Sequence, residues 1–248
     1  NRNHSSKQSI KALDCIKNLY DNFSIDLIYG IPYSSLEKWK NNLKMALKYK
    51  PPHLSCYSLT IEPNTVLNYK VERGEVQLLD ENLIEKQYNY LVEELEKKGY
   101  RNYEFSSFAK PGHNAINNSN YWNGKSYIGI GPSAHSYDGK FTRSWNISNN
   151  IKYVKTIMDN KLPLKKERLN KNDLYNEFIM TGLRKEEGVS LKKVRTLFGI
   201  RYKKYLKKQL KKHIINNNIV FNGDILKISK KAKFLSDGLS SDLFFVDD

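Results

Sequence analysis

The sequence predicts an α/β fold in which a partial (β/α) barrel is followed by a helical, winged-helix-like domain. Two observations lead to this prediction. In the first part of the chain, short apolar segments alternate with amphipathic helical segments, which is the pattern of βα units that build a parallel sheet. In the last part, three helical segments precede two short extended pieces. We place the domains at residues 1–168 and 169–248.

The first domain reads as helices and strands in turn. Apolar side chains spaced three or four residues apart predict the helices, and Gly or Pro residues end two of them. Apolar runs between the helices predict the strands. The predicted helices are 5–20, 35–49 and 81–98, and the predicted strands are 23–30, 53–62 and 100–108, followed by a short strand near 127–130 and an edge segment at 141–146.

The second domain is mostly helical, with predicted helices at 171–184, 190–197 and 201–216. Two extended pieces around the turn Asn222–Gly223–Asp224 predict a hairpin, and a final helix follows. The third helix has an apolar residue at every fourth position, which predicts its buried face: Tyr202, Leu206, Leu210 and Ile214. Three helices and a hairpin are the plan of a winged helix.

The positive charge is concentrated in the second half of the chain. Of the net charge of +16, residues 151–248 contribute +12, from 23 Lys/Arg against 11 Asp/Glu. A basic domain is typical of proteins that bind nucleic acid or an acidic surface. However, Lys, Asn and Ile are abundant together throughout, as an AT-rich genome would produce, and the basic run at 201–212 reads as an amphipathic helix with a solvated lysine face. We therefore expect no nucleic-acid partner, and a nucleic-acid-binding module remains the last alternative.

Cysteine content and hydropathy predict a cytoplasmic protein. The two cysteines, Cys15 and Cys56, exclude a disulfide framework. No apolar run reaches the roughly 18 residues of a membrane span, and no basic-then-apolar signal segment opens the chain. Because the chain begins at Asn1 in polar sequence rather than with a strand, we expect a further segment to precede it.

Polar residues in or after the predicted strands are the candidate site residues, because active sites of βα barrels lie at the carboxyl ends of the strands. Asp26 lies in an apolar strand, where a carboxylate is costly unless it is paired. Either an acceptor for a ribose hydroxyl or a capping or salt-bridged aspartate fits this position. Ser58 and Glu62 end the next strand, and Glu104, in the third, fits a barrel-interior ion pair. The glycine-rich turn at 127–136 lets the backbone approach a ligand closely.

Several motifs occur in a characteristic order along the chain: SIDLIYGIP, HLSCYSLTIEPNT, GYRNYEFSSFAKPG, NYWNGKSYIGIGPSAHSYDG, RSWNISN and, near the end, EFIMTGLRKEEGVSL. In this set the chain resembles the HemW-type radical S-adenosylmethionine (SAM) proteins. These are haem chaperones and relatives of the oxygen-independent coproporphyrinogen III oxidases. The resemblance covers nearly the whole chain and implies a partial radical SAM barrel for its first domain.

The resemblance also implies two cofactors, SAM and a [4Fe-4S] cluster. In the family, three cysteines of a CxxxCxxC loop hold the cluster, because thiolates are its ligands. That loop would lie before residue 1, so this chain alone is expected to bind no cluster and to perform no radical chemistry. The positions that match the family's SAM contacts are Arg2, Asp26, Ser58 and His135, the last through its backbone.

Haem binding in the family is implied by a HNxxYW motif, whose histidine is replaced here by Asn117. An amide is a poor iron ligand, whereas imidazole is a good one. His113 in the same loop is a possible substitute, and Tyr121 belongs to the same motif. The implied partners are haem or a porphyrin and a haem-acceptor protein. The YSLTIEP strand favours the chaperone branch, and the alternative is an oxidase that decarboxylates the propionates of coproporphyrinogen III.

One geometric expectation underlies the assignment of a SAM site. We expect Asp26, Ser58 and the glycine turn before His135 to converge at one mouth of the incomplete barrel, where an adenosyl ligand would lie.

Overall fold

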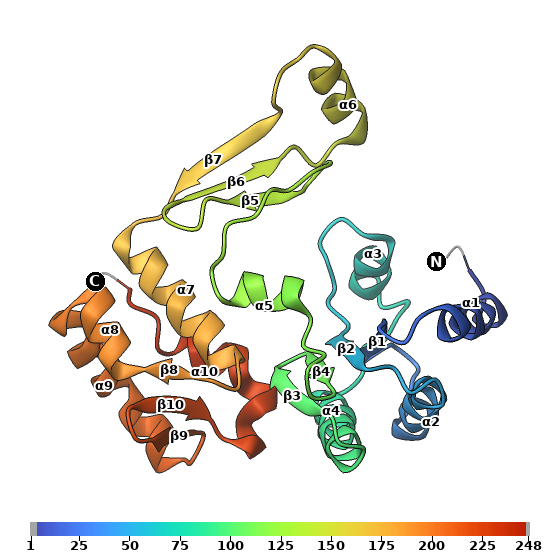
Figure 1. Ribbon diagram of the computed structural model, residues 1–248, viewed down its shortest axis with the longest axis horizontal. Helices are drawn as coiled ribbons and strands as arrows, with labels where there is room; N and C mark the ends of the chain where they lie inside the picture. Colours follow the sequence, from blue (N-terminus) through green and yellow to red (C-terminus); the bar gives the residue numbers. More distant parts are fainter. Residues whose placement is uncertain (1–3, 247–248) are drawn as a thin grey trace. The chain divides into compact units, whose positions relative to one another are not determined.

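A computed structural model describes residues 4–246, and the chain divides into two compact units between Ala115 and Ile116. The first unit alternates helices and strands, and the second contains a three-stranded sheet followed by a helical domain (Figure 1). None of the helices in the described part of the chain has the length and apolar content of a membrane span. The predicted domain boundary at residues 168 and 169 remains a prediction.

In the first unit, the three predicted helices and the strand predicted at 23–30 match the observed elements to within two residues at each end, whereas the strand predicted at 53–62 ends four residues early, at Ser58, and one further helix is present. Its elements are α1 (Ser6–Leu19), β1 (Ser24–Tyr29), α2 (Leu36–Leu47), β2 (His53–Ser58), α3 (Val66–Glu72), α4 (Glu81–Lys97), β3 (Arg101–Glu104) and β4 (Ser107–Ala109). Its sheet has the order β1-β2-β4-β3, with β1 and β2 parallel and the other neighbours antiparallel.

The prediction of one strand over 100–108 was wrong, because the chain reverses at Phe105 and Ser106 to form the β3–β4 hairpin. This turn contains no Gly or Pro. The Asn102 side chain stabilises the turn by hydrogen bonds instead. Its Nδ2 donates to the carbonyl of Glu104 at 2.5 Å and to that of Ser107 at 3.3 Å. The sheet is therefore mixed rather than parallel.

Helices α2 and α4 cover one face of this sheet. Tyr29 of β1 is 1% exposed and packs against Trp39 of α2 and Tyr88 of α4, with ring centroids 5.7 and 6.2 Å away. Gln87 of α4 is also buried, and its Oε1 accepts a hydrogen bond from the N–H of Gly30 at 2.9 Å. These contacts fix the carboxyl end of β1 against α4.

The second unit begins with a region that we call the hairpin region, residues 116–168. Its elements are α5 (Ile116–Trp122), β5 (His135–Tyr137), β6 (Thr142–Asn146), α6 (Asn150–Met158) and β7 (Leu164–Arg168), and the three strands form an antiparallel sheet in the order β5-β6-β7. The predicted edge segment at 141–146 is confirmed as β6. The predicted strand at 127–130 is reduced to one bridge between Tyr127 and Tyr137.

The helices and the hairpin expected of a winged-helix-like domain are found in residues 169–246, a region that we call the winged helix. Its elements are α7 (Lys171–Arg184), β8 (Val189–Ser190), α8 (Leu191–Phe198), α9 (Ile200–Ile215), β9 (Ile219–Asn222), β10 (Ile225–Ile228), η1 (Lys230–Leu235) and α10 (Ser236–Ser241). The strands form an antiparallel sheet in the order β8-β10-β9. Position 188, directly before β8, has to be glycine, because a Cβ there would lie 2.1 Å from the carbonyl oxygen of Leu226.

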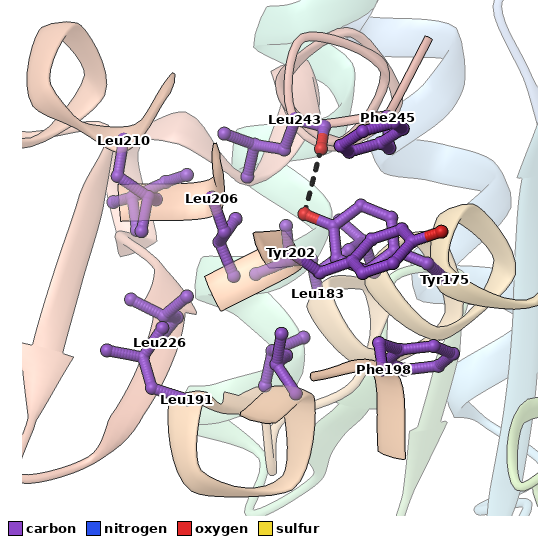
Figure 2. Packing of buried hydrophobic residues seen from close by; sticks show 14 residues of the cluster. Tyr175, Leu183, Leu191, Phe198, Tyr202, Leu206, Leu210, Leu226, Leu243 and Phe245 are labelled. Atoms are coloured by element: carbon purple, nitrogen blue, oxygen red, sulfur yellow. Dashed lines mark hydrogen bonds between the residues drawn. The ribbon is translucent and has the colours of Figure 1, made fainter. Parts of the chain in front are cut away.

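The core of the winged helix is a single apolar cluster that includes Tyr175, Leu206 and Leu226 (Figure 2). The Tyr175 hydroxyl donates to the carbonyl of Leu243 at 3.2 Å, which ties the C-terminal segment to α7. The buried face of α9 differs from the predicted one in its last residue, because His213 is buried and Ile214 is 38% exposed. A repeat of four residues drifts off a helix that turns every 3.6 residues, so the buried stripe steps back by one position.

Candidate functional site

The face of the first sheet opposite α2 and α4 is polar. Side chains alternate between the faces of a strand, so Ser24 and Asp26 of β1 share a face. The parallel register pairs them with His53 and Ser55 of β2. Asp26 is exposed, so its position in an apolar strand does not bury its carboxylate. This exposed carboxylate can accept hydrogen bonds from a ligand.

Ser58 lies on the other face of the sheet. Its register partner is Tyr29, which points at the helices. The Ser58 Oγ is 3.4 Å from the place that a Cβ on Gly30 would occupy, beside Ile84 of α4. The expected convergence of Asp26 and Ser58 is therefore not found, because the register of β1 and β2 turns the two side chains to opposite faces.

A buried histidine, His53, joins neighbouring strands through hydrogen bonds, although the sequence analysis did not select it as a candidate site residue. His53 Nδ1 is 2.7 Å from the Ser24 hydroxyl and Nε2 is 2.9 Å from the Tyr103 hydroxyl. The Tyr103 oxygen also accepts the N–H of Ala115 at 3.3 Å. Burial lowers the pKa of His53, and the Asp26 carboxylate opposes this shift. His53 is the first residue of β2, whereas active sites of βα barrels lie at the carboxyl ends of the strands. Its hydrogen bonds therefore serve to join β1, β2 and β3.

The two glutamates singled out in the sequence have different surroundings. Glu62 is exposed in the loop after β2, where its carbonyl accepts the Thr65 hydroxyl at 2.8 Å. Glu104 is 3% exposed in β3 and pairs with Ser107 in the hairpin register. Glu62 thus holds a loop, and Glu104 belongs to the interior of the first unit.

A hollow of about 460 Å³ lies in the loop after β1, at the carboxyl end of that strand. The hollow is lined by Ile31, Pro32, Tyr33, Ser34, Lys38, Asn41 and Asn42. The Lys38 ammonium donates to the carbonyl of Tyr33 at 3.0 Å, so it stabilises the loop rather than pointing into solvent unpaired.

The glycine turn and His135 belong to the second compact unit. A Cβ on Gly129 would lie 2.2 Å from the His135 carbonyl oxygen, so only glycine allows the turn to lie this close to β5. The Asn146 side chain donates to the carbonyl of Gly131 at 2.8 Å and holds the turn against β6. The His135 ring stacks on Trp145 with centroids 6.0 Å apart. The ligand contact through the His135 backbone, which the family resemblance implies, stays a prediction.

The haem-binding candidates are divided between the two units. His113 belongs to the first unit, where its Nδ1 is 3.3 Å from Asn22 Oδ1. Asn117 and Tyr121 lie on α5 in the second unit, four residues apart and so on the same side of the helix. Tyr121 is 46% exposed. Arg2, the remaining predicted SAM contact, lies outside the described residues.

Tyr121 belongs to a group of aromatic side chains that we call the tyrosine cluster: Tyr121, Tyr127 and Tyr137. The rings of Tyr121 and Tyr127 meet edge to face at 4.6 Å, and those of Tyr127 and Tyr137 lie 6.3 Å apart. Burial raises the pKa of both Tyr127 and Tyr137, so these two phenols stay neutral over an extended pH range. The sequence motif pointed to Tyr121, but the other two rings carried no signal.

Basic side chains connect the hairpin region with α7. Arg143 of β6 forms an ion pair with Glu177 of α7 at 2.5 Å. One face of α7 also carries Arg184, seven residues later, whose guanidinium lies 4.7 Å from the ring centre of Trp122. The adjacent Lys185 donates to Asn123 at 2.8 Å. Aromatic rings and cations thus meet where α5, β6 and α7 come together.

The residues present do not fit an iron–sulfur cluster. Cys15 is exposed on α1 and Cys56 is buried in β2. Burial strongly raises the pKa of the Cys56 thiol, which opposes the thiolate form that iron requires. Among residues 4–246, no group of three or more His, Cys, Asp or Glu side chains is arranged to hold a metal ion.

Comparisons with known proteins show what the chain is similar to. Residues 169–235 match the HemN C-terminal domain family. The chain is 34% identical over 244 residues to the protein named heme chaperone HemW of Buchnera aphidicola subsp. Schizaphis graminum, covering 96% of this chain and 62% of that protein. It is 32% identical over 222 residues to the heme chaperone HemW of Lactococcus lactis subsp. lactis, covering 89% and 58%.

The fold agrees with this relationship. The solved structure of coproporphyrinogen III oxidase (HemN) from Escherichia coli, a radical SAM enzyme, matches with a TM-score of 0.77 at 16% identity, over 98% of this chain and 60% of that chain. This chain spans about 60% of the length of each of these three proteins. The predicted α/β class is confirmed, and within the described residues the first sheet is open rather than a closed barrel. The chain is thus similar to proteins named heme chaperone HemW over most of its length, and its fold matches that of a radical SAM enzyme.

Proposed function

We propose that this chain is part of a haem chaperone, a protein that binds haem and delivers it to an acceptor protein. The observation that carries the proposal is the similarity to proteins named heme chaperone HemW, which extends over 89% and 96% of the chain in two relatives. Tyr121 of the haem-binding motif, which is 46% exposed and meets the ring of Tyr127, supports haem binding in particular.

For the full-length protein we propose SAM and a [4Fe-4S] cluster as cofactors. SAM supplies a radical precursor when it is bound to such a cluster. Asp26 would accept a hydrogen bond from the ribose of SAM, because its carboxylate is exposed on the polar face of the sheet. Arg2 and the His135 backbone are proposed as further contacts. Ser58 has less support, because it faces the helices. With Cys15 and Cys56 as its only cysteines, the 248-residue chain alone is expected to catalyse no radical reaction.

The second candidate function is that of a coproporphyrinogen III oxidase, which would decarboxylate propionate side chains oxidatively. The observation that favours it is the fold match to the HemN enzyme. The two functions share a porphyrin ligand and differ in whether the ligand is altered. Turnover of coproporphyrinogen III by the full-length protein would establish the oxidase and remove the chaperone as the main function.

We propose the cytoplasm as the location and a haem-acceptor protein as the partner. Nucleic acid is not a proposed partner. The exposed lysines of α9 lie opposite the buried stripe of Tyr202, Leu206 and Leu210, as in any amphipathic helix with a solvated face.

Haem binding by this chain tests the proposal. Purified 248-residue protein would be titrated with ferric haem and followed by absorbance, and the loaded protein would then be mixed with apomyoglobin as the acceptor. We expect saturable binding at one haem per chain and transfer to apomyoglobin. Absence of saturable binding, with bovine serum albumin as the positive control, would contradict the proposal.

A further inference from the structure

We propose that four lysines of α9 form the surface by which this protein docks on the haem-acceptor protein, and that the docking surface of the acceptor is a cluster of carboxylates. This inference rests on the proposed function and deepens it, because it names the chemistry by which the acceptor would be recognised. We call the surface the lysine face. Its members share one exposed side of α9: Lys204, Lys207, Lys208 and Lys211.

The lysine face lies opposite the side of α9 that packs in the core. Because an α-helix turns by about 100° per residue, the four lysines fall within about 100° of the helix circumference. Leu206 and Leu210, on the opposite side, are 0% exposed and belong to the apolar cluster of the winged helix. Burial of that side fixes α9 in place, so the lysine face is presented on a rigid element.

Like charges repel one another along the lysine face. Lys204 and Lys208 are four residues apart, as are Lys207 and Lys211, and such pairs of like charge destabilise a helix. The sequence of α9 contains no Asp or Glu. Among residues 4–246, none of these four lysines forms an ion pair. Carboxylates on a partner protein would relieve this repulsion, which favours association with an acidic surface.

The charge pattern of α9 differs from that of other lysine-bearing helices in the chain. Lys40 of α2 pairs with Glu37 at 2.6 Å, and Lys98, which caps α4, lies 3.8 Å from Glu94. An AT-rich genome would enrich lysine throughout the chain, but it would not remove the acidic residues from one helix. The pattern of α9 therefore indicates a cause of its own, and recognition of an acidic partner supplies one.

Carboxylates border the lysine face on both sides and limit what it binds. On one side, Lys212 lies 2.8 Å from the Asp242 carboxylate. On the other side, Lys203 interacts electrostatically with Asp224 in the turn of the β9–β10 hairpin. A nucleic acid whose phosphates continued beyond the face would approach these carboxylates. A compact carboxylate cluster fits between them, along the roughly 10 Å that the face extends on the helix.

Two variants of equal charge separate the lysine face from total charge. The α9 variant replaces the four lysines of the face with glutamine: K204Q/K207Q/K208Q/K211Q. The control variant removes the same charge from two other pairs of exposed lysines spaced four residues apart, on α1 and at the end of α2: K7Q/K11Q/K44Q/K48Q. Both should bind haem as the wild type does. The α9 variant should melt no lower than the wild type, because it removes repulsion.

The probe is bovine cytochrome b5, a small haem protein with an acidic surface. Calorimetry would measure association of its haem-loaded form with the haem-free chain, and stopped-flow absorbance would measure haem transfer from the loaded chain to apocytochrome b5. We expect the α9 variant to weaken association and slow transfer about tenfold or more. The wild type and the control variant should lose affinity steeply as NaCl is raised from about 20 to about 300 mM.

Failure of the inference and failure of the proposed function give different results. Equal losses in both variants would show that total charge alone acts, and no loss in the α9 variant would show that the lysine face is not used; either result overturns the inference and leaves the chaperone proposal standing. Tighter binding of a short DNA duplex or of phosphatidylglycerol vesicles than of cytochrome b5, lost in the α9 variant, would overturn it in favour of those ligands. If the chain binds no haem, the proposed function fails, and association of the haem-free chain still decides whether the lysine face binds an acidic protein.

Discussion

The hairpin region and the winged helix, both in the second compact unit, are built on different principles. The winged helix buries fourteen residues in one apolar cluster. In contrast, none of residues 116–162, all of which the structure describes, is buried. Large apolar side chains such as Ile128 and Ile151 are 86% and 82% exposed there. Backbone pairing and glycine contacts organise the hairpin region, whereas side-chain burial organises the winged helix.

This difference bears on how easily each region opens. A region without a buried core has little apolar burial to hold it in one conformation, so local opening costs less there than in a packed core. The hairpin region is joined to α7 by polar and ring contacts, at Arg143–Glu177, Trp122–Arg184 and Asn123–Lys185. These contacts should therefore open at lower cost than the core of the winged helix.

The largest expected effect comes from emptying the core of the winged helix. Leu206→Ala, at a residue that is 0% exposed, should lower the free energy of unfolding by about 3 kcal/mol through lost burial and a cavity. Ile128→Ala in the hairpin region should change it by less than about 0.5 kcal/mol. Urea unfolding followed by circular dichroism measures both. Equal losses from the two variants would show that the hairpin region has a core of its own.

A glycine pair sharpens the comparison. A Cβ on Gly188 would meet the Leu226 carbonyl oxygen at 2.1 Å, and one on Gly129 would meet the His135 carbonyl oxygen at 2.2 Å. The geometric conflicts are similar, but Gly188 also has a φ of +76° and its neighbour is fixed by the winged-helix core. We expect Gly188→Ala to cost about 2 kcal/mol or more and Gly129→Ala about half as much.

The measurement for the glycine pair is again urea unfolding, with hydrogen exchange at β5 and β10 to locate the change. Gly223→Ala is the control for backbone strain alone, because a Cβ there would have no neighbour within 4 Å while φ is +60°. A larger loss from Gly129→Ala than from Gly188→Ala would contradict the idea that the hairpin region yields more easily.

The sequence was most informative where the core is largest. The predicted helix at 171–184 coincides with α7, because its apolar spacing and its start at Asn170 both mark a buried amphipathic helix. β7 was missed because its sequence LKKER has no apolar alternation, and four of its five residues are exposed. The β3–β4 turn was missed because a side-chain hydrogen bond from Asn102 replaces the usual Gly or Pro signal.

The candidate site was predicted less completely than the fold. Motifs selected Asp26 and Tyr121, which have exposed functional groups in the structure. They could not show that Asp26 and Ser58 face opposite ways, because that depends on the register that aligns Tyr29 with Ser58. Tyr127 contacts Tyr121, and Arg184 contacts Trp122, only through tertiary packing, so no local pattern reveals these contacts.

Removing either partner of the Arg143–Glu177 ion pair, which joins the hairpin region to α7, should change the stability by different amounts. Burial raises the pKa of Glu177, while the Arg143 guanidinium opposes that shift. Removing Arg143 leaves a half-buried carboxylate without its cation, so Arg143→Met should destabilise the protein by about 1 kcal/mol. Glu177→Gln removes the carboxylate charge itself and should change stability by less than about 0.5 kcal/mol. Thermal melting at pH 7 and low salt compares them, and a larger effect of Glu177→Gln would contradict this account.

The smallest effect that we predict is a pH dependence of the winged helix. Burial lowers the pKa of His213, the neighbouring Lys212 lowers it further, and the Asp242 carboxylate opposes them. A neutral His213 therefore favours the folded state above the unfolded-state pKa of about 6.5, and this stability is lost as the pH falls through the lower, folded-state pKa. His213→Gln should flatten the decline in the urea midpoint between pH 7 and pH 5.5.

Asp242 does not confuse this measurement, because its own pKa is lowered by the hydrogen bond with Lys212 and it stays ionised throughout that range. His4→Gln, at an exposed position before α1, is the control. If His213→Gln retained the full decline of the wild type, the acid sensitivity would have to arise outside the core of the winged helix. The hairpin region and the first unit, where His53 is also buried with a lowered pKa, would then be the places to look.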